Sequence, residues 1–371
     1  MVELSASPHG RRSSAGVRLW GLQAESDAFL RLDLLRFIAS MGIVLFHYSE
    51  WVGIDRQITS GLQLFVDVFF VISGLVICYV YSEKVHSRAQ IQNFWISRIA
   101  RIVPLHWAMT LAYVSLGLLA GALGMGLNQP EKYDISCLPG VMTLTHAFGG
   151  CDHLVYNFVS WSISAEFAMY LLFPVLALII VRSRLAVLAL FVGALGALYL
   201  LDDGWWTRSY NFGVLRALPG FLLGCVLYLW RAELSALRLP GVLFGPVLAS
   251  LLAGMILIEA QGVTVLLSYL AVTLIYAMDR HGPPNAVMIR LSLLGQLTYS
   301  LYMLHPLFQT VALSVIGERI LGLQGSVMTL YVVASLPVLI GLSYLSLVKF
   351  ETPMRRLVRK RLATRSVEVK T

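Results

Sequence analysis

The sequence predicts an all-α integral membrane protein, a bundle of about ten transmembrane helices with both termini in the cytoplasm. Of the 371 residues, 58% are hydrophobic and 13% are charged, whereas a soluble domain carries roughly 25% charged residues. Apolar stretches follow one another along the chain, and lysine and arginine concentrate in alternate connecting loops. These observations exclude a soluble globular enzyme.

The distribution of basic residues gives the orientation. With the N-terminus inside, the predicted outer loops hold Arg56, Lys132, Arg208 and Arg319, and the inner loops and tails hold many more basic residues. The same alternation supports the number of spans, because it places both termini in the cytoplasm only if that number is even. The predicted spans lie at about 32–51, 61–81, 104–124, 159–181, 185–201, 211–230, 240–258, 263–278, 291–315 and 327–349.

The predicted membrane domain covers residues 30–350. Residues 1–29 read as a flexible cytoplasmic N-terminal tail without a signal peptide, and residues 351–371 as a basic cytoplasmic C-terminal tail. The net charge of +8 has no accompanying nucleic-acid motif, so we expect no nucleic-acid partner. The basic tail is expected to meet anionic membrane lipids instead.

Two segments between spans carry further information. Residues 88–103 are too polar to span a bilayer and predict an amphipathic helix at the inner surface. The longest predicted outer loop, 125–157, contains Cys137 and Cys151, and the sequence leaves open whether they pair. Cys78 and Cys225 lie in apolar spans as inert thiols, and no cysteine spacing indicates a metal site.

The first span carries two groups that a bilayer disfavours, Arg36 and His47. They are eleven residues apart, which on an α-helix is three turns plus about 20°, so both face one side. The rise between them is about 16 Å. An ionisable side chain at mid-helix costs about 2.5–3.5 kcal/mol. The pair therefore predicts the two ends of one elongated site.

Helical depth brings other ionisable residues to similar levels. His47, Asp67, Glu166 and Arg216 are each predicted to lie roughly 6–11 Å below the outer surface, which indicates a shared chamber. Arginines near the inner surface suit a phosphate-rich ligand. An imidazole in the chamber suits removal of a proton from a hydroxyl, and a nearby carboxylate would orient it.

Seven motifs in order carry a resemblance that runs from about residue 31 to 353. Together they are similar to the membrane-bound acyltransferase family 3, which O-acylates polysaccharides, lipopolysaccharide and other glycans. The motifs are Leu34-Leu35-Arg36 with His47 eleven residues after the arginine, the segment 67–74 (DVFFVISG), the segment 98–104 (RIARIVP), the segment 161–166 (WSISAE) with Tyr170 and Pro174, Arg216 with Phe221 and Gly224, the segment 299–306 (YSLYMLHP), and Phe350-Glu351 with Pro353.

The resemblance implies a ten-helix O-acyltransferase in the bacterial inner membrane. It would transfer an acyl group, expected to be acetyl, from cytoplasmic acyl-CoA to a hydroxyl of a glycan or its lipid-linked precursor. Arg36 and His47 match the family's essential pair, and Arg98 and Arg101 match its basic pair. No metal is implied.

These arguments predict three groups of site residues. A structural role is the alternative for several of them. Asp67 could pair with Arg216 and not orient His47, and the dipole at a helix N-terminus could stabilise Glu166. Ser162 and Ser164 could be capping residues, and Tyr302 and His305 could only support the core. The predicted catalytic residues are His47, Glu166 and Asp67, the predicted donor-binding residues are Arg36, Arg98 and Arg101, and the predicted acceptor-binding residues are Trp161, Ser164, Arg216, Tyr302 and His305.

Two other functions stay open at this point. A proton-coupled transporter of a sugar or other small solute would use the buried histidine and carboxylates as a relay. A scaffold subunit of a polysaccharide assembly complex would carry the same residues without turnover. The sequence identifies neither the acceptor glycan nor the oligomeric state.

Overall fold

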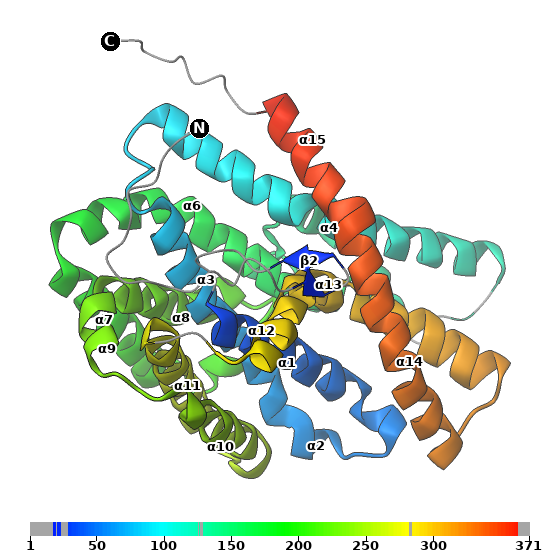
Figure 1. Cartoon of the computed structure of the whole chain (residues 1–371). Helices are drawn as coiled ribbons and strands as arrows, with labels where there is room; N and C mark the ends of the chain where they lie inside the picture. The colour runs from blue at the N-terminus through cyan, green and yellow to red at the C-terminus, as the bar shows by residue number, and fades with distance from the viewer. Residues whose placement is uncertain are drawn as a thin grey trace.

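The computed structural model describes residues 18–19, 21–23, 29–124, 126, 129–281 and 284–362. Most of the predicted N-terminal tail (1–29) and residues 363–371 of the predicted C-terminal tail lie outside these ranges. The predicted all-α class is confirmed apart from one antiparallel pair of two-residue strands, β1 (Arg18–Leu19) and β2 (Leu22–Gln23) (Figure 1). The α-helices are α1 (Leu30–Tyr48), α2 (Arg56–Thr59), α3 (Phe65–Tyr81), α4 (Arg88–Ala122), α5 (Leu138–Met142), α6 (Trp161–Arg182), α7 (Arg184–Leu201), α8 (Gly213–Leu229), α9 (Arg231–Ala236), α10 (Phe244–Leu257), α11 (Gln261–His281), α12 (Ala286–Ser292), α13 (Thr298–Phe308), α14 (Gly325–Leu345) and α15 (Thr352–Leu362).

Seven helical segments of the described chain are long and apolar enough to cross a membrane. The other three predicted spans are also helical: α8 and α10 are shorter apolar helices, and α1 carries charged residues in its first two turns. The count of ten and the orientation of the termini remain predictions. The seven segments are Arg56–Tyr81, Arg88–Ala122, Phe158–Arg182, Arg184–Leu201, Gln261–His281, Ala286–Ile320 and Gly325–Leu362.

The structure joins the predicted surface helix 88–103 and the predicted span from 104 into one helix, α4. Ser87 and Gln90 form a capping box at its start, with the Gln90 N–H donating to Ser87 Oγ (3.3 Å) and the Ser87 N–H donating to Gln90 Oε1 (3.0 Å). Pro104 lies inside this helix. A proline removes one backbone donor, which packing against neighbouring helices offsets.

Helix α1 lies at the centre of the bundle, in contact with α3, α11, α12 and α13. Its first backbone N–H groups have no partner within the helix. Asp279 of α11 supplies that partner: its carboxylate accepts from the N–H groups of Arg31 (3.0 Å) and Leu32 (3.1 Å) and from the Arg31 guanidinium (3.1 Å). This side chain fixes the start of the helix that carries Arg36 and His47.

Helices α3 and α8 approach each other through glycines. A Cβ atom at Gly74 would collide with the backbone of Phe221, and one at Gly224 would collide with the backbone of Val71. Small residues allow this close helix contact in membrane proteins. The close approach brings Asp67 of α3 and Arg216 of α8 to one interface.

The predicted C-terminal tail continues the last span as a helix. Helix α14 passes through a π-helical turn, Ser346–Glu351, into α15, and the whole segment from Gly325 to Leu362 is helical. Helix α15 crosses α4 (Figure 1), where Arg359 hydrogen-bonds Ser97 Oγ. The start of the basic run is therefore ordered against the bundle.

The connection between α4 and α6 consists of short helical turns that pack against α4, α6 and α8. It contains a disulfide between Cys137 and Cys151, with Cα atoms 5.9 Å apart. The pairing that the sequence left open is present in the structure. Cys78 and Cys225 are buried free thiols.

Candidate active site

One cavity of about 530 Å³ lies inside the bundle. Its walls come from six helices, α1, α3, α4, α6, α13 and α15, and its volume is in the range of small-molecule sites. One side is apolar and is formed mainly by α3, including Phe69, Ile72 and Val76. The other side is strongly basic. The cavity thus has the two surfaces that a ligand with an anionic head and a long neutral arm requires.

Arg36, Arg98 and Arg101, the predicted donor-binding residues, all line this cavity. Arg36 Nη1 lies 3.2 Å from Asp33 Oδ1 on the same helix. Arg98 Nη2 donates to Tyr81 Oη (3.0 Å), and its guanidinium lies over the Tyr81 ring at 5.0 Å. Helices α1 and α4 therefore contribute to one basic surface, as the sequence predicted from their shared depth.

Glu166 lines the same cavity. Its Oε1 accepts hydrogen bonds from Ser73 Oγ (2.6 Å) and Tyr170 Oη (2.5 Å). It is the only carboxylate among the described residues that line the cavity. Neighbours from α3 and α6 hold the carboxylate, so its position in the cavity wall is fixed.

Tyr302 and Ser162 also line the cavity, in the part near η6 (Phe158–Ser160). Tyr302 Oη and Ser162 Oγ lie 2.8 Å apart, and each hydroxyl is 3.1 Å from the carbonyl oxygen of Val159. The two hydroxyls tie α13 to the start of α6. We call these two residues the Tyr302–Ser162 layer.

His47 is not among the residues that line the cavity. Its half-buried ring stacks on His305 with centroids 5.4 Å apart and meets the edge of Phe158 at 4.8 Å. The His305 ring in turn lies 5.9 Å from the ring of Tyr302. The rings of His305 and Tyr302 therefore lie between His47 and the cavity that Arg36 lines. No hydrogen bond to the His47 ring is present in the described part of the chain.

Asp67 and Arg216 form a buried ion pair, with Arg216 Nη2 2.7 Å from Asp67 Oδ2. The Arg216 guanidinium lies over the Trp161 ring at 5.2 Å. Ser164 Oγ donates to the Leu144 carbonyl (2.7 Å) and accepts from the Ala147 N–H (3.1 Å). None of these four side chains is part of the cavity lining. The structure thus divides the predicted chamber: only Glu166 lines the cavity, Asp67 is engaged with Arg216, and His47 lies beyond His305.

The sequence profile of acyltransferase family 3, described as "Acyltransferase domain", matches residues 29–348. The chain belongs to acyltransferase family 3. It is 27% identical over 215 residues to O-acetyltransferase OatA of Staphylococcus aureus (strain NCTC 8325 / PS 47), covering 54% of this chain and 34% of that protein. It is 28% identical over 153 residues to Acyltransferase MdmB of Streptomyces mycarofaciens, covering 38% of this chain and 37% of that protein. The chain thus matches about a third of each relative's length, and no solved structure matches it significantly.

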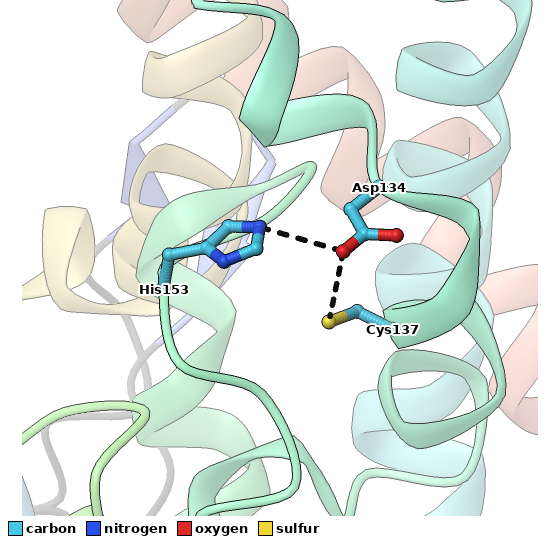
Figure 2. Close-up of side chains that lie close together, drawn as sticks. All are labelled: Asp134, Cys137 and His153. Atoms are coloured by element: carbon cyan, nitrogen blue, oxygen red, sulfur yellow. Dashed lines mark hydrogen bonds and ion pairs between the residues drawn. The ribbon is translucent and has the colours of Figure 1, made fainter.

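Outside the cavity, this acyltransferase-family chain has a cluster of Asp134, Cys137 and His153 in the loop between α4 and α6. Figure 2 shows Asp134 between the other two, with His153 Nε2 3.8 Å and Cys137 Sγ 3.9 Å from Asp134 Oδ2. A metal-binding cysteine acts as a thiolate, but this sulfur is bonded to Cys151. The residues present do not fit a metal, and we draw no chemistry from the cluster.

Two residues that line the cavity of this family member, Arg355 and Arg359 of α15, were not among the predicted site residues. They belong to a basic run that topology alone explains, which is why it was assigned to a lipid-facing tail. Their spacing of four residues places them on one face of a helix. That spacing was the available signal.

Proposed function

We propose that this protein is a membrane O-acyltransferase that transfers an acyl group, expected to be acetyl, from acyl-CoA to a hydroxyl of a cell-surface glycan or its lipid-linked precursor. One observation carries the proposal. The arginines of α1 and α4 and the carboxylate of α6 line one cavity. The apolar side of this cavity ends near the Tyr302–Ser162 layer, and the stacked rings of His305 and His47 lie behind that layer.

The residues of the cavity suit a phosphate-bearing donor. Arg36, Arg98 and Arg101 present guanidiniums, which grip phosphate by paired, charge-assisted hydrogen bonds. The Nε atom of Arg98 is buried and has no hydrogen-bond partner in the described part of the chain. A buried donor without a partner costs about 1–3 kcal/mol, so a ligand oxygen there would be favourable. When bound, acyl-CoA would supply the activated thioester.

His47 is the proposed general base. It would take the proton of the acceptor hydroxyl, whose oxygen then bonds to the acyl carbon while the bond from that carbon to sulfur breaks. The CoA sulfur leaves as a thiolate and takes up the proton that His47 had accepted, so that the imidazole returns to its neutral form. A positioned base of this kind contributes about 10²–10⁴-fold in rate. Because His47 lies beyond Tyr302 and His305, the proposal requires the Tyr302–Ser162 layer to open during transfer.

The other predicted site residues take supporting roles in this proposal. Glu166 positions the basic surface, and Tyr302 and His305 separate the donor side from the acceptor side. Asp67 holds Arg216, and this pair keeps Trp161 and the start of α6 in place, as Ser164 does through its own hydrogen bonds. We assign none of these last four to a chemical step.

The comparisons support acyl transfer more than solute transport or a scaffold role. The family is one of acyltransferases, and the relatives are named an O-acetyltransferase and an acyltransferase. Apolar helices and family membership support a multi-pass membrane protein. The glycan acceptor, the acyl-CoA donor and the bacterial inner membrane as location are parts of the proposal.

The test uses purified full-length protein in lipid nanodiscs with radiolabelled acetyl-CoA and an envelope extract from a strain that lacks the gene. We expect label to enter the glycan fraction, and His47→Ala to lower this rate by about 10²–10⁴-fold. His86→Ala is the matched control, since His86 is exposed and lies outside the cavity. Equal rates for His47→Ala and wild type, with correct folding confirmed by circular dichroism, would remove the role of His47. Solute flux without acylated product would favour a transporter.

A further inference from the structure

We propose that the C-terminal helix α15 is part of the donor site, and that Arg355 and Arg359 bind the phosphate groups of the donor. This inference rests on the proposed function and extends it, because it assigns ligand-binding residues outside the part of the chain that the family profile covers, residues 29–348. The proposed ligand is a molecule that carries several phosphate groups.

The position of α15 supports this assignment. Arg355 and Arg359 lie four residues apart, so they project from one face of the helix. Both line the cavity that Arg36, Arg98 and Arg101 also line. Helix α15 packs against α4, and its place is fixed because it continues α14 without a break. The helix therefore forms a wall of the basic end of the cavity.

The charge of this region supports an anionic ligand. Five arginines line the cavity, and Glu166 is the only acidic residue among the described residues that do. Nearby, Glu351 is 4% exposed, and its Oε1 accepts hydrogen bonds from Ser300 and Ser346 (3.1 Å for Ser346). Like charges that share a poorly hydrated space repel each other unless a counterion joins them. A ligand with three or four negative charges would balance the excess.

Unpartnered donors point to the same ligand. The Nε and Nη2 atoms of Arg355 are buried, and within the described residues they have no hydrogen-bond partner. The Nε atom of Arg98 is in the same condition. Nε and one Nη form the edge of the guanidinium that holds two phosphate oxygens in parallel. Arg355 thus presents an intact bidentate edge at the cavity.

Two sources can supply phosphates at this position, the 3′-phosphorylated nucleotide end of CoA and an anionic lipid headgroup. We commit to the nucleotide end, because Arg355 and Arg359 line the same cavity as Arg98 and Arg101. Arg356 is exposed on the same helix and is not part of the cavity lining. A ligand on the outer surface of α15 would depend on Arg356, whereas a ligand in the cavity would not.

The experiment measures CoA binding by isothermal titration calorimetry to the full-length protein in phosphatidylcholine nanodiscs. We expect Arg355→Gln and Arg359→Gln each to raise the Kd for CoA by about tenfold, the value of one charge-assisted hydrogen bond. Arg356→Gln should leave the Kd within about twofold of wild type. With dephospho-CoA, which lacks the 3′-phosphate, the effects of the two cavity variants should shrink.

The outcomes separate the two levels of the proposal. No CoA binding by the wild type overturns the acyl-CoA donor and this inference together. Wild-type binding with an unchanged Kd in both cavity variants, or with the same loss in Arg356→Gln, overturns this inference alone. Loss of bound phosphatidylglycerol in native mass spectrometry, with an unchanged Kd for CoA, assigns the two arginines to lipid and also overturns it. If a glutamine variant aggregates, Arg355→Lys keeps the charge and removes the bidentate edge, and it should still weaken CoA binding.

Discussion

Asp67 of α3 and Arg216 of α8 form an ion pair inside the bundle, with side chains 0% and 2% exposed and a closest N–O distance of 2.7 Å. The guanidinium also approaches the carbonyl oxygens of Gln63 and Arg208 (3.4 Å each). Asp67 makes no hydrogen bond or ion pair with His47 in the described part of the chain. The geometry therefore favours a structural role for Asp67 over the alternative that it orients the base.

Removal of either partner leaves an uncompensated charge in the core. We expect Asp67→Ala or Arg216→Ala to lower the free energy of unfolding by about 3–5 kcal/mol. The double variant Asp67→Leu/Arg216→Met should recover most of this loss, because it removes both charges together. The measurement is denaturant unfolding in detergent micelles, with Asp202→Ala, at a partly exposed pair with Arg208, as the control. Equal stability of the single and double variants would contradict a paired role.

Glu166 carries the opposite charge to the five arginines that line its cavity. Glu166→Gln removes this charge and keeps the shape of the side chain, so we expect the Kd for CoA to fall by about tenfold or more, since a unit charge about 8 Å away is worth about 2 kcal/mol at an effective dielectric of about 20. Ser73→Ala is the control, since it removes one hydrogen bond to Glu166 without changing charge. A higher Kd in Glu166→Gln would instead mean that the carboxylate accepts a hydrogen bond from the donor.

Three of the five arginines that line the cavity were predicted from the sequence. The separation of His47, Asp67 and Arg216 from this cavity was not predicted, and helix geometry explains both results. A rise of about 1.5 Å per residue gives the depth of a side chain but not which neighbouring helix it faces. The predicted donor-binding residues line one cavity because α1, which carries Arg36, and α4, which carries Arg98 and Arg101, both border it. Asp67 faces α8, where Arg216 forms an ion pair with it.

Arg355 and Arg359 were missed for a different reason. Basic residues after a last span are normally explained by topology, so the four-residue spacing of these two arginines does not by itself indicate a ligand. Their contribution depends on α15 continuing α14 and packing against α4, which is a tertiary contact. Local sequence patterns do not contain that information.

The disulfide between Cys137 and Cys151 closes a short loop in the connection between α4 and α6. The residues it joins are 14 apart, and a loop of this length restricts the unfolded chain by about 3 kcal/mol in the chain-entropy treatment. We expect Cys137→Ser/Cys151→Ser to lower the free energy of unfolding by up to about that amount. Alkylation of the native protein should label neither residue until it is reduced. Modification of both without a reductant would contradict the pairing.

His153 in the same connection makes the stability of this loop depend on pH. Its hydrogen bond to Asp152, above all, raises the pKa of His153, and the Nε2–H donates to the Glu131 carbonyl (3.0 Å). With both ring nitrogens donating, the folded loop favours the protonated imidazole. The stabilisation is complete below the unfolded pKa of about 6.5 and is lost as the pH rises through the higher folded pKa.

We therefore expect the loop to become less protected from hydrogen exchange, relative to a His153→Gln variant, as the pH rises from about 6 to 8. Because His153 lies near the surface, added salt should weaken the effect. The measurement is hydrogen exchange with mass spectrometry on peptides from residues 129–157, with rates corrected for the intrinsic effect of pH. A wild-type loop whose protection changes with pH as the variant's does would show that His153 does not stabilise it through its protonated form.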